Sequence, residues 1–215
     1  MKIESLTVGP LAENCYLVID ESTNRAVLID PGDEPERILS ALSTSGATLD
    51  AIWLTHAHFD HVGAIAGVVR EHPVPVHMHP LDAPVLEQAV DSALRYGVRI
   101  DAPPAADLEL AEGDVLSVGS VKLEVIHLPG HAPGHVAFHG NGVIFGGDCL
   151  FAGSIGRSDI PYGDRETLDA SLVRMVALGD DLAVYPGHGP RTTIGRERRS
   201  NPFLLGAARH VRLRR

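Results

Sequence analysis

The sequence has few cysteines, few aromatic residues and no long apolar run. Only Cys15 and Cys149 occur in 215 residues, without the short paired spacing of a disulfide framework. No apolar stretch approaches the length of about 18 residues that a membrane-spanning helix needs, and residues 1–5 lack the apolar core of a signal peptide. We therefore expect a protein of the reducing cytoplasm that does not span a membrane.

The chain is also poor in basic charge. It carries 18 Lys and Arg against 28 Asp and Glu, a formal net charge of −10 with His neutral. Broad binding to nucleic acid or to an anionic membrane requires a basic face, so we expect neither partner. The arginine-rich residues 191–215 are the exception. We interpret them as a solvated helix face, with a role in gripping an anion as the alternative.

Apolar runs alternate with turn residues along the chain, and this pattern occurs twice. Short apolar runs predict strands at residues 3–8, 15–19, 26–29, 51–54, 73–78, 108–110, 114–118, 121–127, 135–139, 143–145 and 182–185. Helical spacing predicts helices at residues 36–42, 62–70, 81–94 and 164–178, and from 192 onward. Groups of strands followed by helices predict two sheets packed together with helices outside.

Residues 55–61, Thr-His-Ala-His-Phe-Asp-His, hold three imidazoles and one carboxylate. These side chains bind zinc or iron well at neutral pH. The cluster lies between a predicted strand and a predicted helix, which is where α/β folds place ligands. The alternative is a solvated loop rich in histidine. The pattern favours a metal site.

Three later residues end apolar strands beside glycine and match the same chemistry, namely His131, Asp148 and His188. Glycine lets the backbone approach a crowded site closely. The candidate ligands are therefore His56, His58, Asp60, His61, His131, Asp148 and His188. Seven ligands are too many for one tetrahedral ion but suit two ions that share a bridging carboxylate. We expect two divalent ions, zinc first, with iron or manganese as alternatives.

The order of these motifs resembles the metallo-β-lactamase superfamily. Residues 147–159, Gly-Asp-Cys-Leu-Phe-Ala-Gly-Ser-Ile-Gly-Arg-Ser-Asp, resemble its glyoxalase II branch, the hydroxyacylglutathione hydrolases. Residues 186–190, 192–194 and 201–203 fit short-form members of that branch. Full-length members carry a C-terminal helical domain that grips glutathione, whereas 27 residues follow His188 here.

The resemblance implies a single α/β domain over residues 1–215, an αββα four-layer sandwich with the metals at one edge of the two sheets. It implies one metal on His56, His58 and His131 and a second on Asp60, His61 and His188, with Asp148 as the bridge. The implied reaction is hydrolysis of a small-molecule thioester such as S-lactoylglutathione. Oligomeric state is not indicated.

The resemblance and the local pattern also suggest roles for individual residues. Asp60 is expected to orient the nucleophile as well as to bind metal. Arg157 stands where the family contacts an acidic substrate, with a structural salt bridge as an equal alternative. His135 is expected to orient a ligand loop rather than to bind metal, and His77 and His79 to lie at the surface or beside the site.

A second enzyme class competes with the thioesterase. Relatives in the superfamily oxidise persulfides with one iron on the first ligand set, and their motifs overlap this sequence. Those relatives have an acid and an aromatic residue after the final histidine, where this chain has Gly189 and Pro190. A nuclease of the superfamily is a third class, which the acidic charge disfavours.

Overall fold

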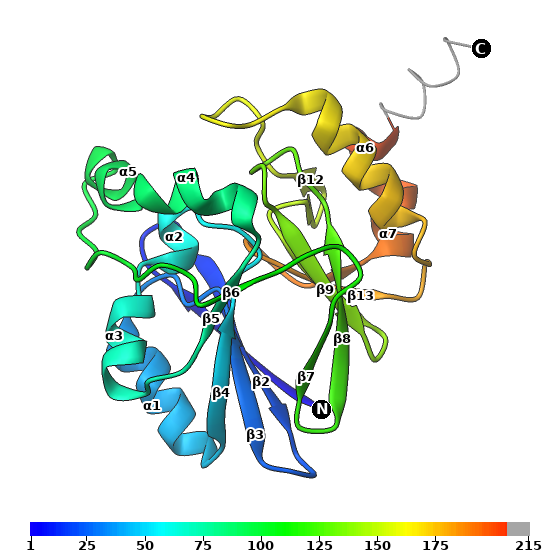
Figure 1. The fold of residues 1–215 in the computed structure, drawn as a ribbon. Helices are drawn as coiled ribbons and strands as arrows, with labels where there is room; N and C mark the ends of the chain where they lie inside the picture. Colours follow the sequence, from blue (N-terminus) through cyan, green and yellow to red (C-terminus); the bar gives the residue numbers. More distant parts are fainter. Residues whose placement is uncertain (206–215) are drawn as a thin grey trace.

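Two six-stranded sheets packed face to face form the centre of the molecule in the computed structural model, which describes residues 1–205 (Figure 1). The first sheet contains, in spatial order, β1 (Lys2–Val8), β2 (Glu13–Asp20), β3 (Arg25–Ile29), β4 (Thr48–Trp53), β5 (Val76–Met78) and β6 (Leu108–Glu109). The second contains β14 (Thr192–Thr193), β13 (Ala183–Pro186), β10 (Val143–Gly147), β9 (Val136–Gly140), β8 (Val121–His127) and β7 (Val115–Val118). A small hairpin joins β11 (Leu150–Phe151) to β12 (Ser154–Ile155).

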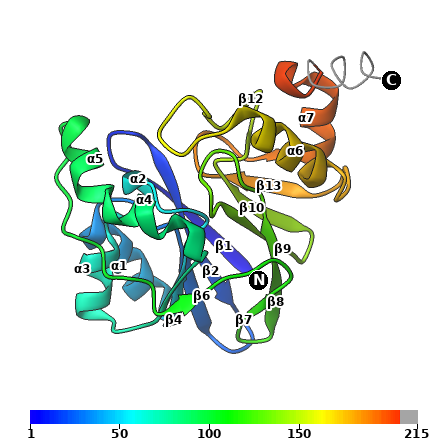
Figure 2. The ribbon, with the colours of Figure 1, turned by 45° about the horizontal axis from the view of Figure 1, so that its top comes forward.

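Helices cover the outer face of each sheet (Figure 2). The first sheet is covered by α1 (Pro35–Ser45), α2 (Phe59–Val62), α3 (Ile65–Glu71), η1 (Pro80–Asp82), α4 (Ala83–Glu87) and α5 (Ala89–Arg95). The second is covered by α6 (Arg165–Val176) and α7 (Ile194–Ser200). The predicted αββα sandwich is therefore confirmed.

Three separate apolar clusters correspond to the three interfaces between these four layers. Strand β3 shows how the sequence supplies two of them. Val27 and Ile29 belong to the cluster between the sheets, whereas Ala26 and Leu28 belong to the cluster under the helices. Successive side chains of a strand point to opposite faces, so a strand buried on both faces is apolar at every position.

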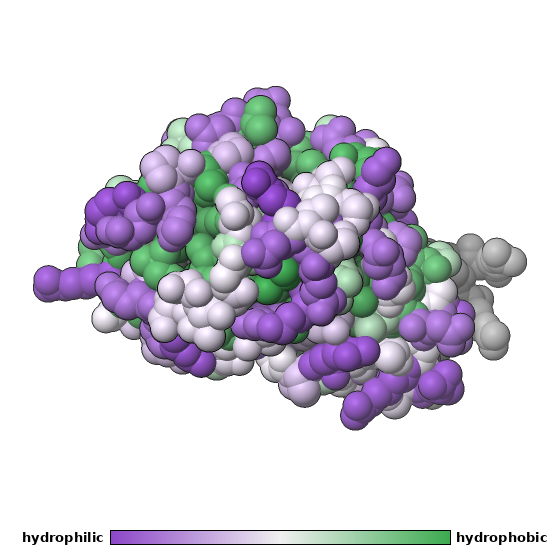
Figure 3. Space-filling view, turned by 90° about the horizontal axis from the view of Figure 1, so that it is seen from below, coloured by the Kyte–Doolittle hydropathy of each residue, from purple (hydrophilic) through white to green (hydrophobic). Residues whose placement is uncertain are grey.

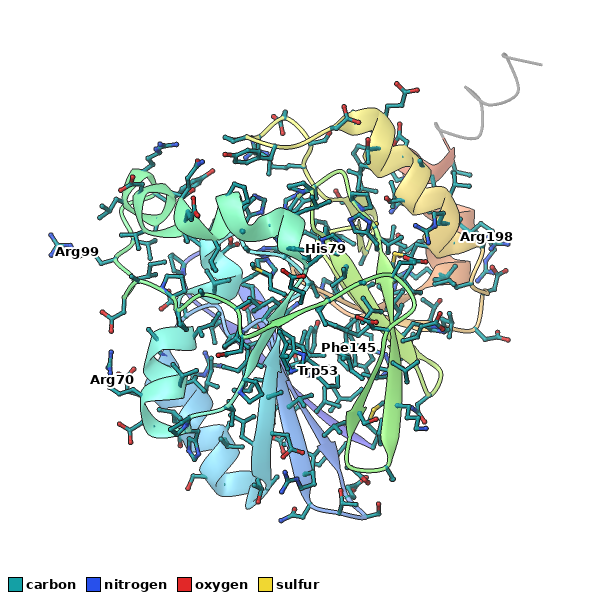
Figure 4. All side chains as sticks on the ribbon, viewed as in Figure 1. Trp53, Arg70, His79, Arg99, Phe145 and Arg198 are labelled. Carbon is teal, nitrogen blue, oxygen red and sulfur yellow. The ribbon has the colours of Figure 1, made fainter. Side chains whose placement is uncertain are left out.

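Large aromatic side chains fill the space between the sheets. Trp53 lies 5.5 Å from Phe138, measured between ring centroids, and Phe145 lies 5.3 Å from Tyr16. Trp53 and Phe145 come from different sheets and both lie in the central space between them (Figure 4). This packing fixes the two sheets against each other and so brings their strand ends to one common edge.

The predicted helices differ from the observed ones in where they break. The predicted helix 62–70 begins at the last residue of α2 and is interrupted before α3, and the predicted helix 81–94 is divided into η1, α4 and α5. Gln88, with φ −91° and ψ 0°, separates α4 from α5. The chain from 192 onward begins as a strand, because residues 192–193 pair with β13 before Thr193 caps α7. The predicted continuation through the last arginines lies outside the described residues.

The end of the sandwich with the N-terminus and the hairpin turns has a mixed surface of hydrophilic and apolar areas (Figure 3). Within residues 1–205, no helix combines the length and apolar character needed to cross a bilayer.

Candidate metal centre

All seven predicted ligands meet at one edge of the two sheets. The segment after β4 carries His56 and His58, and the short helix α2 carries Asp60 and His61. The ends of strands in the second sheet supply the rest, with His131 after β8, Asp148 after β10 and His188 after β13. The sequence placed Asp60 and His61 before a helix, whereas the structure places them inside its first turn, because His58 is the extended residue that precedes α2.

His56, His58 and His131 form a compact set whose ligand atoms lie within 4.8 Å of one another. Nδ1 of His58 lies 2.9 Å from Nε2 of His131. The rings of His58 and His131 stand nearly perpendicular to that of His56, with interplanar angles of 86° and 83°. Three nitrogens that converge in this way can share one cation.

Asp60, His61 and His188 form a second set within the same 4.8 Å limit. Nε2 of His188 lies 3.2 Å from Oδ2 of Asp60, and Nε2 of His61 lies 4.0 Å from the same oxygen. Two histidines and one carboxylate are a common ligand set for a catalytic divalent ion.

Asp148 lies between the two sets and contacts both. Its Oδ2 is 3.5 Å from Nε2 of His131 and 3.6 Å from Nε2 of His188. Its Oδ1 is 3.5 Å from Nε2 of His61. The backbone leaves room for this carboxylate because residue 187 is glycine, where a Cβ would overlap Asp148 and crowd His61.

In three of the histidines, the second ring nitrogen is held by a neighbour. Nδ1 of His131 lies 2.7 Å from the carbonyl oxygen of Arg157, and Nδ1 of His188 lies 3.1 Å from that of Leu11. A carbonyl accepts only from a protonated nitrogen, so Nδ1 carries a proton in both rings and Nε2 is the nitrogen that faces the cluster. His61 is held in the same way by Asp30, at 3.0 Å from its Nδ1.

Two further side chains hold the ligand loops in place. The buried carboxylate of Asp82 accepts hydrogen bonds from the backbone of Ala57 at 2.9 Å and of Gly134 at 2.5 Å, which joins the two histidine loops. Nε2 of His135 accepts from the backbone N–H of Asp148 at 3.0 Å. His135 therefore orients the loop of Asp148, as expected from the sequence.

Two properties of the cluster suit the binding of cations: buried polar atoms without a hydrogen-bond partner, and histidines in their neutral form. Nε2 of His56, Nε2 of His61 and Oδ1 of Asp148 are buried and have no hydrogen-bond partner within residues 1–205. Burial, together with the neighbouring histidines, lowers the pKa of His58 to about 3 and that of His56 well below its usual value. These rings are therefore neutral at pH 7, which is the form that binds metal.

A cleft of about 600 Å³ opens onto the cluster. It is lined by His58, Asp60, His131, Asp148 and His188, by Leu11, Phe59, Tyr96, Phe151, Ile160 and Pro161, and by Ser92, Arg95 and Arg157. Arg157 lies in this wall and forms the salt bridge that the sequence offered as one alternative, with Nε 2.9 Å from Oδ1 of Asp159. Its contact with an acidic substrate stays a prediction.

Sequence reasoning missed several residues around the centre. Asp30 follows an apolar strand and stands two residues before Gly32, as the recognised ligand loops combine a strand end with glycine, but the Asp-Pro-Gly run is equally typical of a turn. Glu13 is buried, and its Oε1 lies 3.8 Å from Nδ1 of His61. Asp82 and Arg95 lie in the interrupted helices η1 and α5 and have no local sequence signal.

His77 and His79 are partly buried, and His79 stacks on His127 at 4.3 Å.

Comparisons with known proteins agree with this architecture. Residues 8–188 match the metallo-β-lactamase superfamily. The hydroxyacylglutathione hydrolase GloC of Haemophilus influenzae is 41% identical over 209 residues, which cover 95% of this chain and 98% of GloC. The crystal structure of TTHA1623 in a di-iron-bound form is 49% identical, with a TM-score of 0.88, over 94% of this chain and 100% of that one.

ETHE1 from Myxococcus xanthus has the same fold at lower identity, 28%, with a TM-score of 0.81 over 96% of this chain and 85% of that one. The His/Asp cluster and the di-iron form of TTHA1623 together indicate a centre for two metal ions. The chain belongs to the metallo-β-lactamase superfamily.

Proposed function

We propose that this protein is a two-metal hydrolase of small-molecule thioesters of the type S-lactoylglutathione. The observation that carries the proposal is the position of Asp148, whose carboxylate lies within 3.6 Å of histidines from both ligand sets. A cleft of about 600 Å³ leads to this point, a volume within the usual range for small-molecule sites. The similarity to GloC supports a thioester as the substrate.

The proposal assigns each ligand to a metal. His56, His58 and His131 would hold the first metal and Asp60, His61 and His188 the second, and Asp148 would serve both sets. The ions are divalent, with zinc, iron and manganese all compatible with nitrogen and carboxylate ligands. Two such ions together supply a hydroxide nucleophile at neutral pH and polarise a carbonyl.

The protein's own residues position the reactants. Burial opposes ionisation of Asp60, but the hydrogen bond with His188 and the charge of His61 lower its pKa. The ionised carboxylate can accept a hydrogen bond from the attacking water and so orient a lone pair toward the thioester carbonyl. The thiolate that leaves is stable near neutral pH, so the cleft needs no strong general acid.

Apolar side chains make the walls of the cleft. The rings of Phe59 and Tyr96 lie 5.2 Å apart and are tilted by 36°, and Phe151 and Ile160 line the cleft as well. These side chains offer apolar contact surface to a small-molecule ligand. We also propose that Arg157 contacts an acidic group of the substrate, which requires it to share or release Asp159.

A reducing cytoplasm suits the proposed reaction. Cys15 and Cys149 are both buried and unpaired, and a thiol product would persist as a thiol in a reducing compartment. We therefore propose that the protein acts in the cytoplasm.

The test combines metal analysis with an assay of thioester cleavage. Purified protein should contain two metal ions per chain and hydrolyse S-lactoylglutathione. The substitution Asp60→Ala should lower kcat at least about a hundredfold, because it removes both a metal ligand and the group that orients the water. Asp181→Ala, at an exposed turn before β13, is the matched control and should retain activity.

One result would favour the competing enzyme class. A single iron per chain, with oxygen consumption on glutathione persulfide and no thioester cleavage, would identify a persulfide dioxygenase and overturn the proposal.

A further inference from the structure

Two arginines line the cleft that leads to the metal centre. Among the described residues of its wall, Arg95 and Arg157 are the cationic side chains other than histidine. They stand out because the chain as a whole has a net charge of −10 and because the floor of the cleft carries Asp60 and Asp148. A cation at such a place attracts the anionic end of a ligand whose other end reaches the metals.

The two arginines differ in what they already bind. Arg157 pairs with Asp159 through two contacts, Nε to Oδ1 at 2.9 Å and Nη2 to Oδ2 at 3.2 Å. Asp159, and to a smaller extent Tyr96, raise the pKa of Arg157. Arg95 has no carboxylate within ion-pair distance in residues 1–205. Arg95 is thus the cation of the cleft whose hydrogen-bond donors are available to a ligand.

Neighbouring contacts hold Arg95 in the wall of the cleft. It is the last residue of α5, which packs against the metal-binding helix α2. The ring of the next residue, Tyr96, packs at a tilt of 36° against Phe59 of that helix, with 5.2 Å between ring centroids. On the other side, Nε2 of Gln88 donates to the hydroxyl of Tyr162 at 2.6 Å and ties the start of α5 to the loop that follows Arg157.

We propose that Arg95 binds a carboxylate on the thiol part of the substrate and thereby gives the cleft a preference for anionic thioesters. In the proposed binding mode the thioester carbonyl lies at the metal cluster and the thiol part lies along the cleft toward Arg95, which lines the same cleft. A guanidinium suits a carboxylate because its planar donors can form two parallel hydrogen bonds. This inference rests on the proposed function, since it names the substrate class of the same site.

The kinetic test compares an anionic substrate with its neutral derivative. Arg95→Gln should raise KM for S-lactoylglutathione about tenfold with little change in kcat, because a charge-assisted contact to a group remote from the reaction is lost. KM for the diethyl ester of the same substrate should not change. Arg95→Lys, which keeps the charge, should restore part of the loss.

Arg99→Gln is the matched control. Arg99 lies four residues further along the chain, does not line the cleft and points away from the body of the molecule (Figure 4). Its substitution removes the same charge without touching the site, so KM for both substrates should equal that of the unaltered protein. If Arg95→Gln and Arg99→Gln change KM equally, the effect arises from the net charge of the protein and the inference is wrong.

A binding measurement separates this inference from the proposed hydrolysis. Calorimetry on the metal-loaded protein should show tighter binding of glutathione than of glutathione diethyl ester, and Arg95→Gln should abolish the difference. If the protein cleaves no thioester but shows this preference, the proposed function fails and the anion site stands. If it cleaves thioesters but binds the acid and the ester equally, the anion site is wrong and the proposed function stands.

Discussion

Oδ2 of Asp30 lies 3.0 Å from Nδ1 of His61, and both side chains are buried. The same carboxylate accepts from the backbone N–H and the hydroxyl of Thr55, at 2.7 Å and 2.6 Å. A carboxylate placed behind a ligating imidazole fixes its orientation and increases its basicity toward the metal. Asp30 therefore links the end of β3 to the histidine cluster although it does not face the cleft.

Replacing Asp30 with asparagine should weaken metal binding. An amide cannot supply the charge that the imidazole of His61 experiences, and loss of such a partner typically costs about 10- to 100-fold in metal affinity. Competition with a chromogenic chelator measures the affinity of each site. Asp91→Asn, at an exposed position of α5, should leave both affinities unchanged. Unaltered affinity in Asp30→Asn would mean that the contact only supports the fold.

Asp148→Asn should affect both metals, because its carboxylate contacts histidines of both sets. Elemental analysis should show that the variant retains at most one metal per chain, with both sites weakened. His188→Ala removes a ligand of the second set alone, so it should retain one metal.

The control is His72→Ala, at the exposed C-cap residue of α3. This variant should keep two metals. Loss of a single metal from Asp148→Asn, with the other bound at its original affinity, would contradict the bridging position.

Asp82 should make stability depend on pH. Burial raises its pKa to about 6, against the two backbone hydrogen bonds that lower it. Because the folded-state pKa lies above the unfolded value of 3.8, the contribution of this group is fully present below pH 3.8 and is lost as the pH rises through 6. The loss is on the order of 3 kcal/mol. Urea denaturation at several pH values between 4 and 7.5 measures it.

Asp82→Asn cannot ionise and should be less stable overall, because an amide replaces one of the two acceptor oxygens. Its free energy of unfolding should vary less with pH than that of the unaltered protein. The difference between the two pH profiles reports on Asp82 alone, because the other titrating groups are present in both proteins. Parallel pH profiles would show that the carboxyl titrates at an ordinary pKa.

Both thiols should be inert in the folded protein. Cys15 and Cys149 are fully buried, and burial, followed by the charge of Asp148, raises the pKa of Cys149 to about 12. Only a thiolate reacts quickly with a disulfide reagent. Ellman's reagent should therefore detect no thiol under native conditions and two in denaturant. Rapid labelling of one native thiol would point to a reactive cysteine.

The strands and the sandwich followed from local patterns in the sequence. Residues 26–29 are apolar at every position because β3 has a sheet on one face and helices on the other. Helix boundaries were harder to predict, because an apolar stripe does not reveal an interruption such as that at Gln88. The β14 pairing depends on the neighbouring strand β13 rather than on the propensity of residues 192–193.

The sequence by itself predicted the two-sheet architecture and the seven candidate ligands that the structure brings together, because each of them follows an apolar strand in a recognisable local motif. Only the tertiary structure decided which residues support them. Asp30 meets His61 across 31 positions, and Arg95 reaches the cleft because α5 packs on α2. Such contacts are set by the order of strands in a sheet and by the packing of helices over it. Neither is recorded in the residues next to Arg95, and the residues next to Asp30 show only the end of a strand, not its contact with His61.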